Sequence, residues 1–282
     1  MRNIFIPPNI IGFFWLATLF VLPLPVQAME TLPKADFGEL QRTGLAVITG
    51  VIDPLTVQAR DGRTIRLSGI ESPDLHVEPT GEYAVLAHKI LSDLLIGETV
   101  TLYQTKNKDR GRINRMGHHL AHLERQSDKA WVQGALISLG VVRVKTTAWN
   151  REMAEKMYLL EDLARAQNLG LWKDQSFAIR QADEVSALNT MLHRRMVIEG
   201  TVESVSLNNN RIFINFGKNW RNDFTASIAP GDKRLFRKSG LDPMQWGGKR
   251  LRVRGWMRNY NGPYIEIDHP EAIEILSDNT SG

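Results

Sequence analysis

A compact group of polar side chains follows a predicted β-hairpin in the first third of the chain. Two β-patterned runs, residues 45–60 and 64–70, are joined by Asp61-Gly62, a dipeptide that tolerates the positive φ of a tight turn. Pro73 cannot donate to a sheet, so the chain should leave the sheet here as a rim loop. The polar group at this rim comprises Arg66, Glu71, Ser72 and Asp74.

These residue types could together hydrolyse a phosphodiester. Carboxylate oxygens bind hard cations, a carboxylate can activate water, and an arginine offsets the charge of a phosphoryl transition state. The alternative is a solvated rim whose charges have no chemical role.

The elements around this rim predict a small α+β domain. Apolar residues recur at helical spacing in residues 82–95, and Gly97 follows where a helix would end. Further strands are expected at 99–103, 117–123 and 141–144, and further helices at 131–139 and 151–168. A sheet made from these strands could close into a barrel.

The C-terminal part is predicted to be mostly β. Residues 197–206 and 211–216 flank an asparagine turn, and residues 249–257 and 264–267 flank Asn261-Gly262, a strong hairpin signal. One helix is expected at 232–239. This pattern predicts a second small, barrel-like domain of the oligonucleotide-binding type.

The N-terminus has the pattern of a secretory signal peptide, residues 1–28. A basic start precedes the mainly apolar residues 10–26, and Val26-Gln27-Ala28 has the small-x-small form of a cleavage site. An uncleaved anchor is the alternative, and no later stretch is long and apolar enough to span a bilayer. The absence of cysteine suits a bacterial periplasm. We therefore expect an exported protein, periplasmic or secreted.

Several segments resemble the staphylococcal nuclease-like, or thermonuclease, family over about residues 45–173. They read "VIDPLTVQARDGRTIRLSGIESPD", "LLIGETVTLY", "NRMGHHLAHL", "VQGALISLGVVRV" and "LEDLARAQNLGLW". The resemblance implies a five-stranded OB-type barrel with three helices for residues 44–173. The remaining chain then divides into a helical linker at 174–195, a β-rich OB-like domain at 196–276 and a disordered tail at 277–282.

The resemblance also implies roles for individual residues. Arg66, Asp74 and His118 fall on catalytic positions: an arginine, the residue that orients or deprotonates water, and a second arginine that is histidine here. Glu71 and Ser72 fall on metal positions, as a calcium-binding acid and a backbone-carbonyl ligand. A further calcium-binding aspartate of the family is Leu55 in this chain, so Ca²⁺ is possible by resemblance but its site is weakened. Histidine in place of arginine also replaces a permanent charge with a group that is mostly neutral at pH 7.

Three histidines in "GHHLAH" suggest a different metal site. In a strand, His118 and His122 would share one face and His119 would point to the other, which is poor spacing for joint ligation. They are therefore interpreted as surface or phosphate-contacting residues, and a zinc or manganese site requires His118 to lie opposite Glu71.

Basic residues are concentrated in two parts of the chain. The loop 106–115 contains five of them, including Arg112 and Arg115, which we expect to bind substrate.

Between residues 196 and 258, twelve lysines and arginines face five acids, although the whole chain has a formal charge of only +4. Aromatic residues are interleaved with these cations, as in single-strand-binding grooves. The candidates for substrate binding are Arg211, Trp220, Arg252 and Arg254. The alternative is a solvated basic face over core aromatics.

Three hypotheses about function follow. The leading one is an exported thermonuclease-like protein that binds nucleic acid (DNA or RNA) or another polyanion through a degenerate phosphodiesterase site. The second is an active metal-dependent nuclease, and the third is an envelope protein-interaction module that binds no nucleic acid. The sequence does not fix the oligomeric state.

Overall fold

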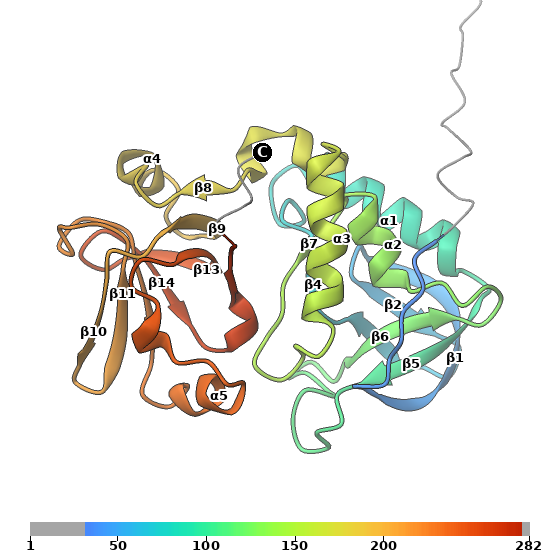
Figure 1. Cartoon of the computed structure of the whole chain (residues 1–282). Coiled ribbons are helices and arrows are strands. Elements are labelled where there is room, and N and C mark those ends of the chain that lie inside the picture. Colours follow the sequence, from blue (N-terminus) through green and yellow to red (C-terminus); the bar gives the residue numbers. More distant parts are fainter. Residues whose placement is uncertain (1–31, 278–282) are drawn as a thin grey trace, which may run out of the picture. The chain divides into compact units, whose positions relative to one another are not determined.

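The computed structural model describes residues 32–277 (Figure 1). The predicted signal peptide and all but the first residue of the predicted tail lie outside this range. Within it, no helix is long and apolar enough to cross a membrane.

The first part of the chain folds as a closed five-stranded barrel covered by helices. The strand order is β1 (Gln41–Asp53), β2 (Thr56–Ala59), β3 (Thr64–Leu67), β6 (His119–Arg125) and β5 (Thr99–Gln104), which pairs back with β1. The helices are α1 (Glu82–Leu95), α2 (Val132–Ser138) and α3 (Ala154–Ala166). This confirms the predicted α+β barrel with three helices.

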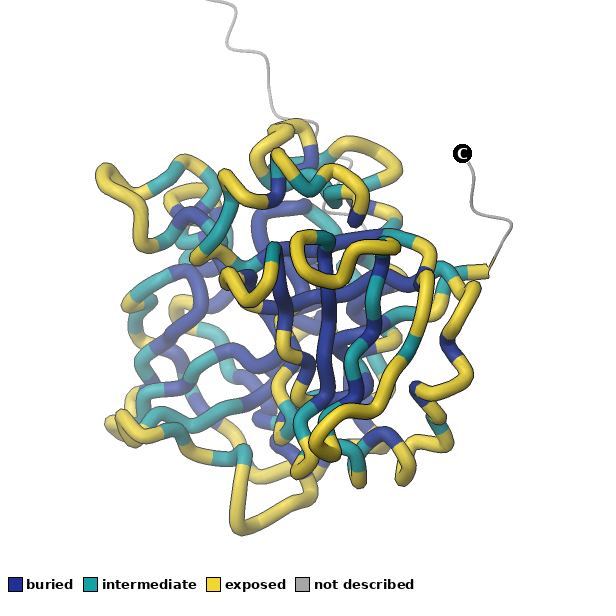
Figure 2. The backbone as a smooth tube through the Cα atoms, turned by 90° about the vertical axis from the view of Figure 1, so that its left-hand side faces the viewer, coloured by how far each residue is buried: buried dark blue, intermediate teal, exposed yellow. Residues whose placement is uncertain are grey.

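The residues of the β2–β3 turn explain why the chain forms a hairpin here. Gly62 has a φ of +88°, and the predicted turn at Asp61-Gly62 joins β2 to β3. A second turn at Pro54-Leu55, which was not predicted, divides the first run into β1 and β2. Apolar side chains from the strands fill the barrel, and Ile48, Val57, Ile65, Leu102 and Leu123 are completely buried. Figure 2 shows that buried segments run through the middle of the structure and that the exposed segments are mostly loops at its edge.

A two-stranded sheet lies beside the barrel and positions the polar rim. It consists of β4 (Ile70–Glu71) and β7 (Arg143–Val144), which are antiparallel and place Glu71 directly opposite Arg143. The backbone N–H of Lys145 donates to the carbonyl of Gly69 at 2.8 Å and extends this pairing. Residues more than seventy positions apart in sequence therefore meet at the rim.

The C-terminal part is a curled eight-stranded sheet. Along its path the order is β10 (Ser204–Asn208), β11 (Arg211–Asn215), β12 (Thr225–Ile228), β14 (Pro263–Ile267), β13 (Arg250–Asn259), β9 (Arg194–Thr201) and β8 (Arg180–Gln181), and β15 (Ile273–Ile275) pairs with β13. The helix α5 (Lys233–Lys238) follows β12, and the hairpin at Asn261-Gly262 joins β13 to β14 as predicted.

The segment predicted as a helical linker is only partly helical. It contains the 3-10 turn η3 (Gln175–Phe177), the strand β8 and the short helix α4 (Val185–Asn189). A further 3-10 turn, η2 (Gly170–Lys173), precedes it, and η4 (Pro243–Gln245) and η5 (Pro270–Ala272) lie later in the chain. Because β8 pairs in parallel with β9, this segment contributes a strand to the second sheet.

Buried ion pairs connect α3 of the first part to β13 of the second. Arg254 Nη1 lies 2.6 Å from Glu161 Oε2, and the two side chains are 2% and 0% exposed. The approach is an ion pair rather than an aligned hydrogen bond, and Arg254 also donates to Glu274 Oε1 at 2.9 Å. Tyr158 lies under the same guanidinium, 4.4 Å from ring centroid to Cζ. Residues 32–277 accordingly belong to one compact unit.

Candidate functional site

Arg66 is held at the end of the barrel hairpin with part of its guanidinium accessible. It lies opposite Thr56 in the β2–β3 ladder, and its Nη1 donates to Thr56 Oγ1 at 2.9 Å. The same atom lies 3.5 Å from Asp53 Oδ2, while Asp53 Oδ1 accepts from the Leu55 N–H at 2.7 Å. About a third of the Arg66 side chain stays exposed. It can therefore still donate to an incoming anion.

Glu71 lies among three cations. Its Oε1 accepts from Arg143 Nη2 at 2.9 Å and lies 3.5 Å from Arg195 Nε, and its Oε2 lies 3.8 Å from Lys145 Nζ. The Glu71 side chain is only 13% exposed. One carboxylate thus faces three positive groups, and Arg195 comes from β9 of the second sheet.

Lys145 is the most accessible member of this group. Its side chain is 45% exposed. Partial burial, together with the guanidinium groups of Arg195, Arg66 and Arg143, lowers the pKa of Lys145 below its usual 10.5, although Glu71 opposes this. A lysine whose charge is disfavoured by neighbouring cations gains from an anion placed beside it.

Asp74 caps a helix instead of facing the rim. Its Oδ2 accepts from the N–H of Tyr83, the second residue of α1, at 2.9 Å, and its Oδ1 accepts from Ser72 Oγ at 3.4 Å. Gly81 precedes the helix, and a Cβ built there would lie 2.2 Å from Asp74 Oδ2. The glycine therefore lets the carboxylate reach the helix N-terminus. Asp74 is therefore buried and engaged by two donors, and its catalytic role stays a prediction.

The three histidines do not converge on one point. His118 precedes β6, where its backbone N–H donates to Asn114 Oδ1 at 3.0 Å. It lies two residues before Leu120, which pairs with Arg66, so His118 immediately precedes the strand next to the retained arginine. His122 is buried and accepts from Trp131 Nε1 at 3.3 Å, and burial lowers its pKa to about 3. Within residues 32–277, no three His, Asp or Glu side chains are grouped to hold a metal ion.

A family model described as "Staphylococcal nuclease homologue" matches residues 64–174. These residues form a staphylococcal nuclease homologue domain. The match begins at β3 and ends at η2, so it covers Arg66, Glu71 and the helices but neither Asp53 nor Leu55. No curated protein matches the chain.

The nuclease homologue domain does not provide the calcium ligands that the family resemblance implies. Leu55 is 3% exposed and belongs to the apolar core, so an oxygen ligand is absent where one is expected. Glu71 is already paired with cations, and the Ser72 carbonyl accepts from the Leu75 N–H at 3.3 Å. Because calcium affinity depends on the number and charge of the protein ligands, the residues present fit Ca²⁺ poorly. The predicted metal roles of Glu71 and Ser72 are therefore not supported by this geometry.

The basic loop beside the nuclease homologue site has one accessible candidate and one structural arginine. Arg112 donates from Nε to the Thr105 carbonyl at 2.9 Å and from Nη2 to the Lys106 carbonyl at 3.4 Å, so its guanidinium closes the loop. Arg115 is exposed. Arg110 lies over the Trp149 ring at 4.8 Å. Arg112 and Arg115 were both predicted to bind substrate, and of the two Arg115 is the one whose side chain is accessible to a ligand.

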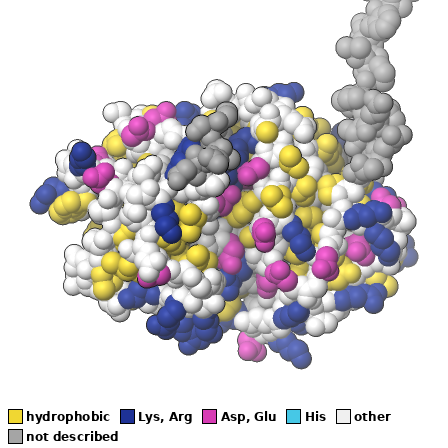
Figure 3. All heavy atoms as spheres, viewed as in Figure 1, with side chains coloured by type: hydrophobic (Ala, Val, Ile, Leu, Met, Phe, Trp, Pro, Cys, Tyr) yellow, Lys and Arg dark blue, Asp and Glu magenta, His cyan; other side chains and the backbone are white. Residues whose placement is uncertain are grey.

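The predicted substrate-binding residues of the second sheet are mostly occupied. Arg252 pairs with Glu199 at 2.6 Å and with Asp162 and Glu274 at 3.1 Å, and Arg254 is buried. Both residues connect parts of the fold through these ion pairs, and their role in substrate binding stays a prediction. On the face drawn in Figure 3, basic and acidic side chains are both exposed, and several basic ones gather at the lower left.

The two other candidates in this sheet differ in exposure. Arg211 Nη1 donates to Glu266 Oε2 at 2.8 Å and to Ser227 Oγ at 3.0 Å. Trp220 is 50% exposed, and Arg221 lies 4.4 Å from its ring centroid. Trp220 is therefore the accessible member.

Sequence reasoning missed Arg143, Lys145 and Arg195. The sequence did carry one signal: in the otherwise apolar "GVVRV", Arg143 is a charge inside a buried strand and so requires a partner. Which carboxylate would pair with it depends on the β4–β7 register.

Proposed function

We propose that the nuclease homologue domain binds single-stranded nucleic acid or a similar polyanion at the Glu71 rim and does not hydrolyse it. The observation that carries this proposal is that Arg143, Lys145 and Arg195 surround the one carboxylate expected to bind metal. We further propose that the protein is exported, on the signal-peptide pattern of residues 1–28.

The charge balance at the rim favours an anion over a metal ion. Arg66, Arg143, Lys145 and Arg195 are positive, and the carboxylates within ion-pair distance of them are Asp53 and Glu71. A divalent cation would meet net positive charge there, whereas a phosphate would meet partly exposed donors on Arg66 and Lys145. Arginine and lysine bind phosphate through charge-assisted hydrogen bonds.

Two of the groups that hydrolysis requires are missing from this arrangement. Asp74 is engaged at the helix N-terminus, so no carboxylate of the predicted set is free to activate water. His118 stands where the family has a second arginine, so the permanently charged, forked donor of that arginine is missing here. Binding without turnover is what the remaining groups support.

The salt dependence of binding tests the proposal. Fluorescence anisotropy with labelled single-stranded DNA and the full-length chain should give an affinity that falls steeply with salt. Lys145→Ala should reduce the slope of log K against log salt by about 0.7, the value for one lost phosphate contact on a single strand.

The matched control is Lys89→Ala. Lys89 is an exposed lysine on α1 that pairs with Asp93 at 2.6 Å, so this variant removes the same charge away from Glu71. If both substitutions reduced the salt slope equally, the DNA would be held by non-specific electrostatic attraction and the proposed site would be wrong. Absence of any DNA binding would instead support a protein-interaction module.

A further inference from the structure

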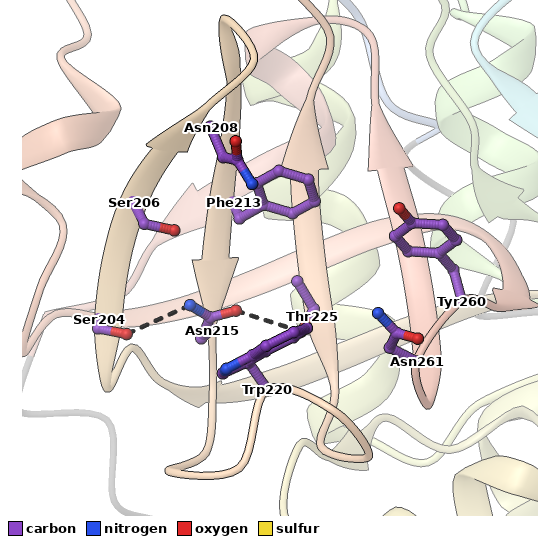
Figure 4. Close-up of a pocket in the computed structure, with 9 residues that line it drawn as sticks. All are labelled: Ser204, Ser206, Asn208, Phe213, Asn215, Trp220, Thr225, Tyr260 and Asn261. Carbon is purple, nitrogen blue, oxygen red and sulfur yellow. Dashed lines mark hydrogen bonds between the residues drawn. The ribbon is translucent and has the colours of Figure 1, made fainter.

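A pocket on the second sheet has a different chemistry from the cationic rim. Its volume is about 420 Å³, within the range of small-molecule sites. The lining residues come from β10, β11, β12, the loop between β11 and β12, and the β13–β14 turn (Figure 4). They are Ser204, Ser206, Asn208, Phe213, Asn215, Trp220, Thr225, Tyr260 and Asn261.

None of these nine side chains is charged, although the surrounding module is strongly basic. A nucleic-acid strand carries a phosphate on every nucleotide and is normally held by lysine and arginine. Arg221 lies against the Trp220 ring and Arg211 pairs with Asn208 in the β10–β11 ladder, but neither arginine is part of the lining. The pocket therefore favours a neutral ligand.

The polar lining can both donate and accept hydrogen bonds. Across the floor, Asn215 Nδ2 donates to Ser204 Oγ at 3.2 Å and Asn215 Oδ1 accepts from Thr225 Oγ1 at 3.4 Å. These bonds fix the amide and leave one N–H of Asn215 and the hydroxyl hydrogen of Ser204 free to donate.

Four further polar groups have no side-chain partner within residues 32–277: the hydroxyls of Ser206 and Tyr260 and the amides of Asn208 and Asn261. Hydroxyl and amide groups of this kind match a ligand that carries many hydroxyls.

Three aromatic rings complete the lining. Trp220 is 50% exposed and Tyr260 is 56% exposed, and Phe213 on β11 is half-buried. Figure 4 shows the three rings on different sides of the polar floor. Exposed aromatic faces with polar groups beside them suit a ligand with one apolar face and a polar rim.

We propose that this pocket binds a small neutral saccharide. The C–H face of a sugar ring packs on an aromatic side chain, and the hydroxyls bond to the asparagine and serine groups of the floor. No cation is needed, so the interaction is independent of the polyanion site on the first barrel.

Saturation-transfer NMR on the full-length chain tests the proposal, with a panel of neutral disaccharides and with a thymidine trinucleotide as the anionic probe. At least one disaccharide should receive saturation at its ring C–H protons, and its affinity should not change between low and high salt. Trp220→Ala and Tyr260→Ala should each weaken binding about tenfold, equivalent to about 1.4 kcal/mol.

Trp149→Ala is the matched control and should leave saccharide binding unchanged. Trp149 is 41% exposed and also stacks with an arginine, but it belongs to the first part of the chain. Salt-sensitive binding of the trinucleotide in place of the sugars would overturn the proposal, as would the absence of binding by every disaccharide in the panel.

Discussion

Arg143 and Glu71 face each other across two short strands, with Nη2 and Oε1 2.9 Å apart. The same carboxylate is within ion-pair distance of Lys145 and Arg195. The pairing gives Glu71 a structural role in holding cations, in the place where the family resemblance implies a metal ligand. The consequences of this arrangement can be measured.

Removing the Glu71 charge should strengthen polyanion binding. Glu71→Gln leaves the three neighbouring cations without their shared counter-charge, so a bound phosphate experiences a more positive rim. We expect affinity for single-stranded DNA to rise about fivefold at low salt, since such a change corresponds to about 1 kcal/mol. Anisotropy at constant ionic strength gives this value.

Glu155→Gln is the control for that increase. Glu155 lies in the first turn of α3, is exposed and carries the same charge. It should change affinity much less than Glu71→Gln does. A loss of DNA binding in Glu71→Gln would instead show that the carboxylate itself is needed at the site.

As pH rises, polyanion binding should begin to weaken at a lower pH than it would if Lys145 had the pKa of an ordinary lysine. The pKa of Lys145 is lowered by partial burial and by three arginines, and only the protonated amine attracts phosphate. Affinity contributed by this residue is therefore full at low pH and is lost as pH rises through a pKa below 10.5. Lys145→Arg stays protonated and should bind oligo(dA) equally at pH 7 and pH 9.5. Parallel pH profiles for the two proteins would exclude this assignment.

Buried His122 should make the fold sensitive to mild acid. Burial lowers its pKa from the ordinary 6.5 to about 3 in the folded state, so between these two pH values the unfolded chain binds one more proton than the folded chain. The free energy of unfolding then falls as pH drops below 6.5, by about 2 kcal/mol between pH 6.5 and 4.5 from this residue. His122→Gln should remove that part of the dependence in urea unfolding. An unchanged pH dependence would mean that His122 is protonated in the fold.

Arg254 should be essential for stability because it is the buried partner of Glu161 and Glu274. Although burial lowers its pKa, the neighbouring carboxylates raise it above its usual value, so Arg254 stays charged. Arg254→Met leaves buried carboxylates unpaired and should lower the free energy of unfolding by about 3–5 kcal/mol. Urea unfolding measures this change.

Arg258→Met provides the comparison on the same strand. Arg258 also pairs with a glutamate, Glu266 at 2.8 Å, but its side chain is 51% exposed. An exposed pair of this kind is worth about 1 kcal/mol or less. If the free energy of unfolding fell by a similar amount in the two variants, burial of the Arg254 ion pair would not increase its contribution to stability.

Much of the fold could be predicted because its signals are local. Helix α1 was predicted with its observed bounds, since the apolar spacing and Gly97 define it within one segment. The turns at Gly62 and Asn261-Gly262 required positive φ, which the residue types indicate. Two or three strands could be expected over residues 45–70, but the turn at Pro54-Leu55 was not placed, although Asp53-Pro54 is a dipeptide that favours a turn.

The candidate site was less predictable because it depends on pairing between distant segments. Arg66 could be selected from its strand and its resemblance, but the partners of Glu71 come from β7 and β9. Asp74 was assigned to the rim because it follows Glu71 closely, whereas the chain turns it toward the start of α1. Arg252 and Arg254 looked like a basic binding surface in sequence, and only the packing of β13 on α3 shows that they are buried.

The effect of calcium on the complex with single-stranded DNA tests the central claim most directly. Labelled DNA is incubated with the full-length chain in excess Ca²⁺ or in chelator, and the bound fraction and the DNA length are read from the same sample. We predict equal binding and intact DNA in both conditions. Calcium-dependent shortening of the DNA that disappears in Arg66→Ala would contradict the account and show that the nuclease site is active.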